Sequence, residues 1–220
     1  ELAAPGEIPL LDGSLLLDRF ALSPGADAAG RVEFDAVLTP ISMQRLTQAL
    51  GWPEMRGRLS GVIPALSYEQ GRLEMRGNLL VRVFDGEVLV RDLRMEDLLG
   101  VWPVLMAELE LRNLDLESLT GTFAFGKITG RLEGRVQGLR LEDWAPVGFD
   151  ARFNTPAQDR SRHRISQRAV ENISDLGGAG ISGALSRSFL RGFKEFGYKR
   201  LGIRCRLHQG ICEMGGVAPA

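Results

Sequence analysis

The sequence predicts a mainly β protein in which an elongated, curled antiparallel sheet forms a hydrophobic groove. We expect short helices between the strands, and a C-terminal helical segment followed by a hairpin. Three observations support this fold class. Apolar and polar side chains alternate along several segments, glycines lie inside those segments, and a pattern of one helix and one strand occurs twice. Strand side chains point to alternate faces, so this alternation predicts strands with one apolar face.

The alternation is strict in two segments of the first half. In residues 31–38 the apolar set is Val32, Phe34, Ala36 and Leu38, which alternates with Arg31, Glu33 and Asp35. The second segment covers residues 72–83 and leads to Asp85-Gly86, a dipeptide typical of hairpin turns, after which a strand resumes at Glu87. Weaker strands are expected at 14–22, 57–68, 107–112 and 146–153.

Residues 126–144, GKITGRLEGRVQGLRLEDW, predict a strand with an unusual inner face. Its even positions are Ile128, Gly130, Leu132, Gly134, Val136 and Gly138, and its odd positions are polar. A closed core would fill such a face with interlocking side chains. Glycines instead leave gaps and let a sheet bend, because glycine tolerates strained backbone. The pattern therefore favours a curved apolar trough, although the glycines could also receive a packed helix.

Two short helices are expected between the strands, and they belong to a sequence repeat. Thr39 is the expected N-cap of a helix with Pro40 at its first position, and Asp115 caps a second helix. Residues 46–66 align with residues 119–139 at an offset of 73 positions, sharing Gly-Arg-Leu-x-Gly and a closing leucine. A repeated helix followed by strands is typical of elongated architectures.

The pattern changes at Ala157, so we divide the chain into a β part, residues 1–156, and a C-terminal part, residues 157–220. The C-terminal part is expected to be helical, with a break in the glycine-rich stretch 177–183. The first helix would carry Ile165, Ala169 and Ile173 on one side. The second, 181–196, would pack its phenylalanines against the sheet or, as the alternative, lie on a membrane surface.

The two cysteines, Cys205 and Cys212, are expected to form a disulfide. Residues 201–208 alternate like a half-buried strand, and a tight turn centred on His208-Gln209 would place Cys205 directly opposite Cys212. A reduced buried pair is the alternative. A disulfide would indicate an oxidising compartment such as the periplasm.

Composition and motifs argue against several functions. The net charge of −1 gives no basic field for nucleic acid. The longest apolar run, Val101–Ala107, contains Pro103 and is far too short to span a membrane. The sequence GAGISG at 178–183 lacks the preceding strand of a dinucleotide site, and His163 and His208, both expected at the surface, have no partner at metal-ligand spacing. We therefore expect no cofactor, no metal and no enzyme. Because the chain opens at Glu1, we expect it to be a piece of a longer protein.

Three stretches, HRISQRAVENISDLGG, GALSRSFLRGFKEFGYKRLGIRCRL and FGKITGRLEGRVQGLRLEDWAPVGFDA, resemble the C-terminal part of the YdbH family. That family belongs to the AsmA-like envelope proteins related to TamB and YhdP, and the resemblance covers roughly residues 115–216. It implies a parent protein anchored in the inner membrane of a Gram-negative cell. It also implies AsmA-like β-repeats whose groove carries phospholipids across the periplasm to the outer membrane. A small outer-membrane lipoprotein of the YnbE type would extend the sheet by strand pairing.

The groove and the resemblance together predict which residues contact lipid. The candidate acyl-chain contacts are Leu73, Met75, Leu79, Val81, Val83, Ile128, Leu132 and Val136. The alternative function is an interaction module in outer-membrane biogenesis, whose exposed sheet edge captures strands of partner proteins.

Overall fold

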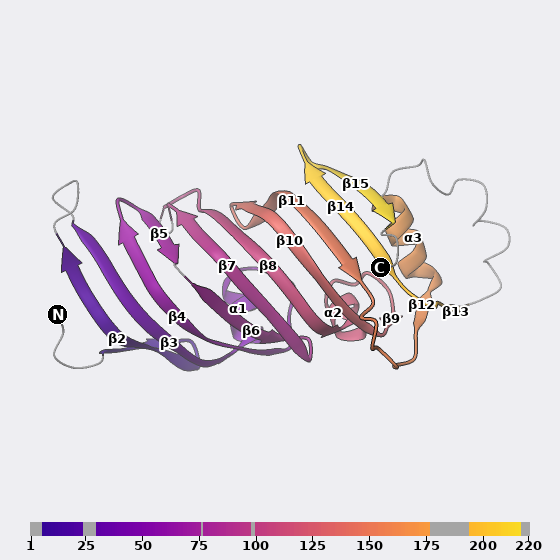
Figure 1. Cartoon of the computed structure of the whole chain (residues 1–220), viewed down its shortest axis with the longest axis horizontal. Helices are drawn as coiled ribbons and strands as arrows, with labels where there is room; N and C mark the ends of the chain where they lie inside the picture. Colours follow the sequence, from indigo (N-terminus) through magenta and orange to yellow (C-terminus); the bar gives the residue numbers. More distant parts are fainter. Residues whose placement is uncertain (1–5, 24–29, 76, 98–99, 177–193, 217–220) are drawn as a thin grey trace.

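The structure is a computed structural model that describes residues 6–23, 30–75, 77–97, 100–176 and 194–216. Its main feature is one long antiparallel sheet of 12 strands that curls along its length (Figure 1). The strands of this sheet are β1 (Gly6–Leu10), β2 (Gly13–Ser23), β3 (Arg31–Ser42), β4 (Gly57–Glu69), β5 (Arg72–Met75), β6 (Asn78–Val83), β7 (Gly86–Glu96), β8 (Val104–Asp115), β10 (Arg131–Glu142), β11 (Ala145–Asn154), β14 (Gly202–His208) and β15 (Ile211–Gly216). The mainly β fold class expected from the alternation is confirmed.

The strands follow one another in nearly the order of the chain. Strands β5 and β6 share one place between β4 and β7, because β5 pairs with one end of β4 and β6 with the other. The segment 72–83 is thus two strands rather than one, broken beside Gly77, whose φ is +136°. The hairpin expected at Asp85-Gly86 is present, but its turn residues are Phe84 and Asp85.

The two ends of the strands differ, and we name them by their connections. At the helix end lie the connections from β3 to β4 and from β8 to β10, each of which contains a short helix. At the turn end lie tight turns between β4 and β5, between β10 and β11, and between β14 and β15. Strand partners at the helix end include Ser42 with Arg58, and those at the turn end include Glu142 with Ala145.

The helices at this end are α1 (Met43–Ala49) and α2 (Leu116–Thr122). Asp115 caps α2 as expected, accepting a hydrogen bond from Ser118 N–H at 2.8 Å. The expected start of α1 was wrong. Thr39 and Pro40 belong to β3, and the helix begins after Ser42. Pro40 lies where the pairing of β3 with β4 shifts register, so its missing N–H costs no ladder hydrogen bond.

The 73-residue repeat extends much further than the matched sequence. Strands β2 and β3 and helix α1 recur as β7, β8 and α2, each with both bounds displaced by 73 positions. Strand β4 recurs as β10, whose start at Arg131 aligns with Arg58. Each repeat therefore places one helix at the helix end and adds a similar set of strands to the sheet.

A buried threonine organises each helix connection in the same way. Thr47 Oγ1 donates to Met43 O, and Thr120 Oγ1 donates to Leu116 O. Each hydroxyl also accepts a backbone N–H from eight residues further along the chain, Met55 in the first repeat and Ile128 in the second. Both threonines are almost fully buried, so the repeats share a packed joint between helix and strand.

The C-terminal segment differs from its expected helices. Residues Arg164–Ser166 form strand β12, so Ile165 lies in a strand, and helix α3 covers Gln167–Leu176. Strand β12 pairs with β9 (Ile128–Thr129) and β13 (Glu195–Gly197) in a small sheet, which places Ile165 opposite Ile128. Ser166 Oγ accepts from Ala169 N–H and thereby caps α3. The glycine-rich stretch and most of the expected helix 181–196 lie outside the described residues, and its last two residues belong to strand β13.

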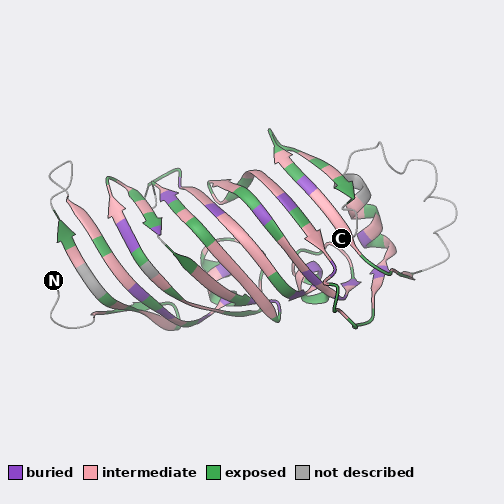
Figure 2. Cartoon of the chain, viewed as in Figure 1, coloured by how far each residue is buried: buried purple, intermediate pink, exposed green. Residues whose placement is uncertain are grey.

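The largest packed cluster of the described residues lies at the helix end. It joins the two repeats and the C-terminal segment through Met43, Val83, Phe84, Leu114, Leu116, Ile128, Leu132, Ile165 and Ala169. Elsewhere, buried positions form separate bands along the strands, with half-buried positions between them (Figure 2). The division at residue 156 stays a prediction. The C-terminal part continues the main sheet, because β14 pairs with β11.

Candidate functional site

One face of the main sheet is apolar from one side of the molecule to the other. Because residues directly opposite each other on paired strands share a face, the register defines rows of side chains across the sheet. One row runs through Leu79, Val90, Leu109, Val136, Ala151, Cys205 and Met214. A second, nearer the turn end, runs through Leu22, Val32, Tyr68, Leu73, Met95, Leu105, Leu141 and Pro146. We call this surface the apolar face.

The opposite surface, the charged face, carries cross-strand ion pairs over its second half. Glu110 contacts Arg91 at 2.6 Å and Arg112 at 2.9 Å. The hydrogen bond from Arg112 lowers the pKa of the Glu110 carboxyl below its ordinary value. Asp150 accepts from Arg204 at 3.1 Å, and this bond is the largest cause of its lowered pKa. These groups stay ionised near neutral pH, so over the second half of the sheet the two faces differ sharply in polarity. In the first half the same surface carries the exposed row of Leu16, Val37 and Val62.

Seven of the eight predicted lipid-contact residues are on the apolar face, and they differ in exposure. The eighth, Ile128, lies in β9 of the small sheet. Leu73, Leu79 and Val81 are half-buried, whereas Met75, Val83 and Val136 are buried. Ile128 and Leu132 are 3% and 4% exposed, because they pack in the helix-end cluster against Ile165 and Ala169. A ligand could therefore reach the first three directly, while the last two serve the packed core.

The glycines of residues 126–138 leave less room than expected. A Cβ on Gly134 would collide with the backbone oxygen of Arg152 and lie 2.7 Å from Phe153 Cδ1, so the backbone of β11 and this ring together close the position. A Cβ on Gly130 would lie 2.6 Å from the Tyr198 hydroxyl. Gly138 has φ +60° at a register shift of β10 and faces open space. Gly126 receives helix α3, because a Cβ there would lie 2.6 Å from Ala169 N. Three of the four glycines thus lie tightly against neighbouring groups, and the fourth, Gly138, bends the strand.

Several residues of the apolar face were missed in the sequence. Val90, Leu109, Leu105 and Leu141 are half-buried and complete the two rows. The repeat holds a signal for three of them, since Val90, Leu105 and Leu109 occupy the positions of Leu17, Val32 and Ala36 after a shift of 73 residues. Alternation alone does not reveal them all, because register shifts change which positions share a face.

An aromatic contact shows how strongly the sheet curls. Trp52 follows α1 at the helix end, and Trp144 lies in the turn between β10 and β11 at the turn end. Their ring centroids are 6.1 Å apart in an edge-to-face arrangement. A straight strand of the length of β10 would separate the two ends by roughly 35 Å. The strands must therefore bend toward the side on which α1 lies.

That side is the apolar one. Met43 of α1 belongs to the same cluster as Leu132, and Leu132 shares its face with Val136. Register shifts in five of the strand pairs, from β2–β3 to β10–β11, supply the bends. The apolar face is consequently concave, and the charged face is convex.

A charged cleft opens at the helix end. It has a volume of about 1140 Å³ and lies between the connection that follows α1, the hairpin of β6 and β7, and helix α2. Its lining includes Arg58 and Arg82, which are direct cross-strand partners, and Glu87, which pairs with Arg82 at 3.5 Å. Acidic and basic side chains both contribute to the lining.

A buried polar cluster fastens the C-terminal segment to the start of β10. Asp159 accepts hydrogen bonds from the N–H groups of Arg131 and Ser161 and lies 2.9 Å from His163 Nε2. Burial alone would raise the pKa of Asp159, but these hydrogen bonds outweigh it and hold the pKa well below its usual range. The expectation that His163 is a surface residue was wrong, because its ring stacks on Tyr198.

Tyr198 completes this cluster. Its hydroxyl donates to Thr129 O at 2.7 Å, and burial raises the pKa of Tyr198 to about 12. The cluster thus links the small sheet, the start of β10 and residues 155–163. We interpret it as a structural joint, because its polar groups satisfy one another.

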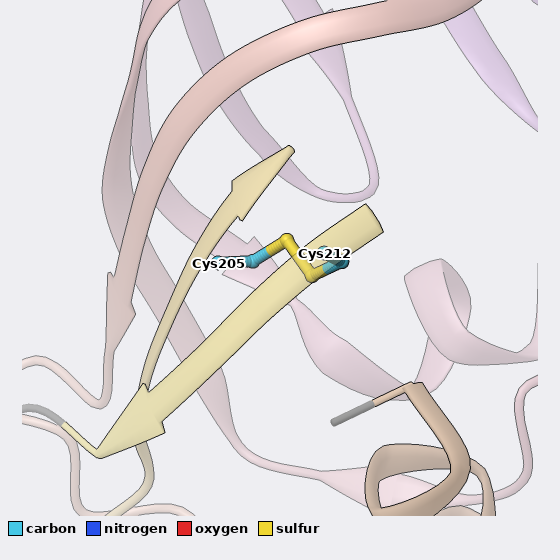
Figure 3. Close-up of a disulfide and its surroundings, with 2 residues drawn as sticks. All are labelled: Cys205 and Cys212. Atoms are coloured by element: carbon cyan, nitrogen blue, oxygen red, sulfur yellow. A yellow bond between two sulfur atoms is a disulfide. The ribbon is translucent and has the colours of Figure 1, made fainter. Parts of the chain in front are cut away.

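The expected disulfide is present in the terminal hairpin (Figure 3). Cys205 and Cys212 are bonded with their Cα atoms 5.7 Å apart. The expected register was wrong, however. The turn residues are Gln209 and Gly210, so Cys205 lies opposite Met214 and the bond runs diagonally across the hairpin. The bond fixes β15 to β14, and it favours an oxidising compartment.

Among the described residues, no group of histidine, cysteine and acidic side chains could hold a metal ion. None of the helices in the described ranges is long and apolar enough to cross a lipid bilayer. Comparisons with protein-family models, with curated proteins and with solved structures found no match.

Proposed function

We propose that the apolar face binds the acyl chains of phospholipids, and that the parent protein moves these lipids across the periplasm between the inner and outer membranes. The observation that carries the proposal is the concave apolar face itself. It crosses strands from β2 to β15, and helices α1 and α2 pack at the helix end of the strands. Half-buried side chains such as Leu79, Val90 and Leu109 remain in reach of a ligand.

The physical chemistry of such a face suits a sliding ligand. Each methylene that leaves water contributes about 0.8 kcal/mol, and the attraction has no preferred direction. An acyl chain can therefore shift along the rows without breaking directional bonds. The charged, convex face stays hydrated through its ion pairs. The disulfide and the resemblance to the YdbH family support the periplasm as the compartment.

A photo-crosslinking experiment tests the binding face. A photoreactive residue at Leu109 lies on the apolar face, and a control at Arg135 lies on the charged face of the neighbouring strand. We expect phospholipid adducts at position 109 and none at 135, detected by mass spectrometry after irradiation of cells. Equal labelling of the two positions, or none at 109, would refute the proposal.

A pair of lysine substitutions tests the same face in the purified protein. Val90→Lys places an ammonium group in the apolar row, whereas Leu89→Lys on the same strand faces Glu110 on the charged side. We expect the first variant to lose most of its copurified phospholipid and the second to keep it, with both retaining the circular dichroism of the parent. Full lipid content in Val90→Lys would contradict the assignment.

The second candidate function is an interaction module that captures a partner strand. It is favoured by β15, which pairs with β14 on one side and ends the main sheet among the described strands. Ile211 of this strand is 68% exposed. A lipoprotein of the YnbE type could add a strand there. Met214→Pro removes an N–H from the free edge of β15, so it would then abolish capture of the partner, while lipid binding along the rows from β2 to β14 persists.

A further inference from the structure

We propose that Trp52 and Trp144 form a latch across the apolar face, which must open before a phospholipid headgroup can pass along it. This inference rests on the proposed function and concerns its regulation. The first argument is the path that the contact closes. From α1 the protein surface runs through Val88, Val90 and Leu105 to the turn end, and Trp144 then touches Trp52 beside α1. The concave face is thus encircled at this point.

The encircled surface has opposite consequences for the two parts of a phospholipid. Val90, Leu105 and Leu109 inside the ring are half-buried rather than fully packed, so an acyl chain can lie against them. A charged headgroup cannot follow along this surface, because it would lose its hydration without finding polar partners. It must instead pass where the two tryptophans meet, and the rings must separate to admit it.

The second, independent argument is the backbone of the turn that carries Trp144. The turns between β4 and β5 and between β14 and β15 have glycine at their second position, with φ of +78° at Gly71 and +74° at Gly210. Trp144 occupies the same position of its turn with φ +62°. A left-handed backbone is unfavourable for a bulky residue and easy for glycine. The turn therefore does not require tryptophan, and the contact with Trp52 explains why this residue is there.

The other half of the latch is held firmly. Trp52 N–H donates to Thr47 O at 2.8 Å, and Gln44 Nε2 donates to Glu54 Oε1 at 2.7 Å across the same loop. In the second repeat the aligned residue is Phe125, which packs against the helix-end cluster. The position that packs in the core of the second repeat, as Phe125, is therefore occupied in the first repeat by Trp52, which contacts Trp144 of the turn end.

The contact is also weak enough to open during transport. A single aromatic pair favours the closed latch over the open one by about tenfold at most. Little free energy is therefore needed to separate the two rings. The latch would hold acyl chains against the apolar face between openings, while a headgroup waits beside the ring.

The first experiment removes the latch. Trp144→Gly introduces the residue that the other two tight turns at the turn end have at this position. Trp102→Ala, which removes an exposed tryptophan of the neighbouring loop, is the matched control. Purified protein is loaded with fluorescent phosphatidylethanolamine from vesicles, and the rates of loading and release are measured by stopped flow. We expect Trp144→Gly to exchange lipid about three- to tenfold faster, as expected for the loss of one aromatic pair, with unchanged lipid stoichiometry.

The second experiment locks the latch. The variant Trp52→Cys/Trp144→Cys is treated either with a short bismaleimide, which bridges the two thiols, or with N-ethylmaleimide, which caps them separately. The native disulfide stays oxidised, so only the introduced thiols react. We expect the bridged protein to stop exchanging lipid and the capped protein to exchange it faster than the parent.

The outcomes separate the latch from the proposed function. Lipid bound in normal amounts and exchanged at one rate in the bridged, capped and parent proteins would overturn the latch alone. No lipid bound to the parent protein would overturn the proposed function and the latch with it. If Trp102→Ala exchanged lipid as slowly as the bridged protein does, the slowing would not be specific to the Trp52–Trp144 contact. That result would also overturn the latch.

Discussion

At the scale of single residues, Asp159 shows how a carboxylate can fasten two parts of a chain. It is nearly inaccessible and accepts from Arg131 and Ser161. Because its pKa in the folded protein lies below the unfolded value, it stabilises the fold above about pH 4, and this contribution is lost as the pH falls toward the folded pKa.

Asp159→Asn should therefore destabilise the protein at neutral pH and change its acid sensitivity. We expect a loss of about 2 kcal/mol in the free energy of unfolding at pH 7, in keeping with hydrogen bonds to a charged acceptor. Below pH 4 the variant should approach the parent. Urea denaturation at several pH values measures both effects. A difference that stays constant from pH 7 to pH 3 would rule out the ionised carboxylate as the cause.

Residue-level prediction from the sequence succeeded where the signal is local. The cap at Asp115 depends on residues within one turn of helix, and it was found. The environment of His163 depends on Tyr198 and Asp159, which the fold brings together, and nothing in the neighbouring residues indicates the stacking. Likewise, the burial of Ile128 in β9 and of Leu132 in β10 comes from strand β12 and helix α3, which are distant in the sequence.

At the scale of elements, the two threonine joints make the repeats comparable. Thr120→Val keeps the shape of the side chain but leaves the buried N–H of Ile128 without its acceptor. We expect a loss of about 2 kcal/mol in the free energy of unfolding. Thr47→Val should cost less, because the Met55 N–H that it leaves without an acceptor is only partly buried, whereas the Ile128 N–H is buried. Thr120→Ser, which retains the hydroxyl, is the control. Equal losses in Thr120→Val and Thr120→Ser would point to packing instead.

The terminal hairpin offers a second test at this scale. Cys205→Ala/Cys212→Ala removes a bond that closes a short loop, with a sequence separation of 7. Loops of this length correspond to about 2 kcal/mol of stabilisation on the chain-entropy model. We expect a lower melting temperature in calorimetry without reductant. In excess reductant, the parent and the variant should have the same melting temperature. A difference that persists there would mean that the cysteine side chains matter for packing.

Element boundaries were predicted well where pairing follows the alternation and poorly where distant partners decide. The start of α1 was placed at Thr39-Pro40 by local preference, but pairing with β4 keeps these residues in β3. Residues 164–166 were assigned to a helix, yet β9 and β13 hold them as a strand. The register of the β14–β15 hairpin also differs from the expected one, because glycine at position 210 favours a turn at Gln209-Gly210.

At the scale of the whole molecule, the sheet is a chain of neighbours. Each strand pairs mainly with those next to it in sequence, so a local defect should spread only to adjacent elements. In Thr120→Val we expect faster amide hydrogen exchange in β8, β9 and β10, with unchanged protection in β2 and β3. Mass spectrometry of peptic fragments resolves these regions. A uniform increase across all fragments would show that the molecule unfolds as one cooperative unit.

The fold class could be predicted because the alternation of apolar and polar residues and the 73-residue repeat are both visible in the sequence. The curl was expected too, from the glycines inside the strands, but its course could not be predicted, since it depends on register shifts and on the meeting of Trp52 with Trp144 across the width of the sheet. The continuous apolar rows lie between these cases. Their members alternate visibly in 31–38 and 72–83, but which residues face one another is known only from the pairing.

The 73-residue period has a consequence for how such a molecule can change in length. A whole repeat adds its strands and one helix connection, and it returns the chain to the same end with the same side facing inward. A shift of the strand pairing by a single residue would instead turn hydrophobic side chains outward. The molecule can therefore be extended or shortened only in quantised steps. The length of the apolar face would then be set by the number of repeats.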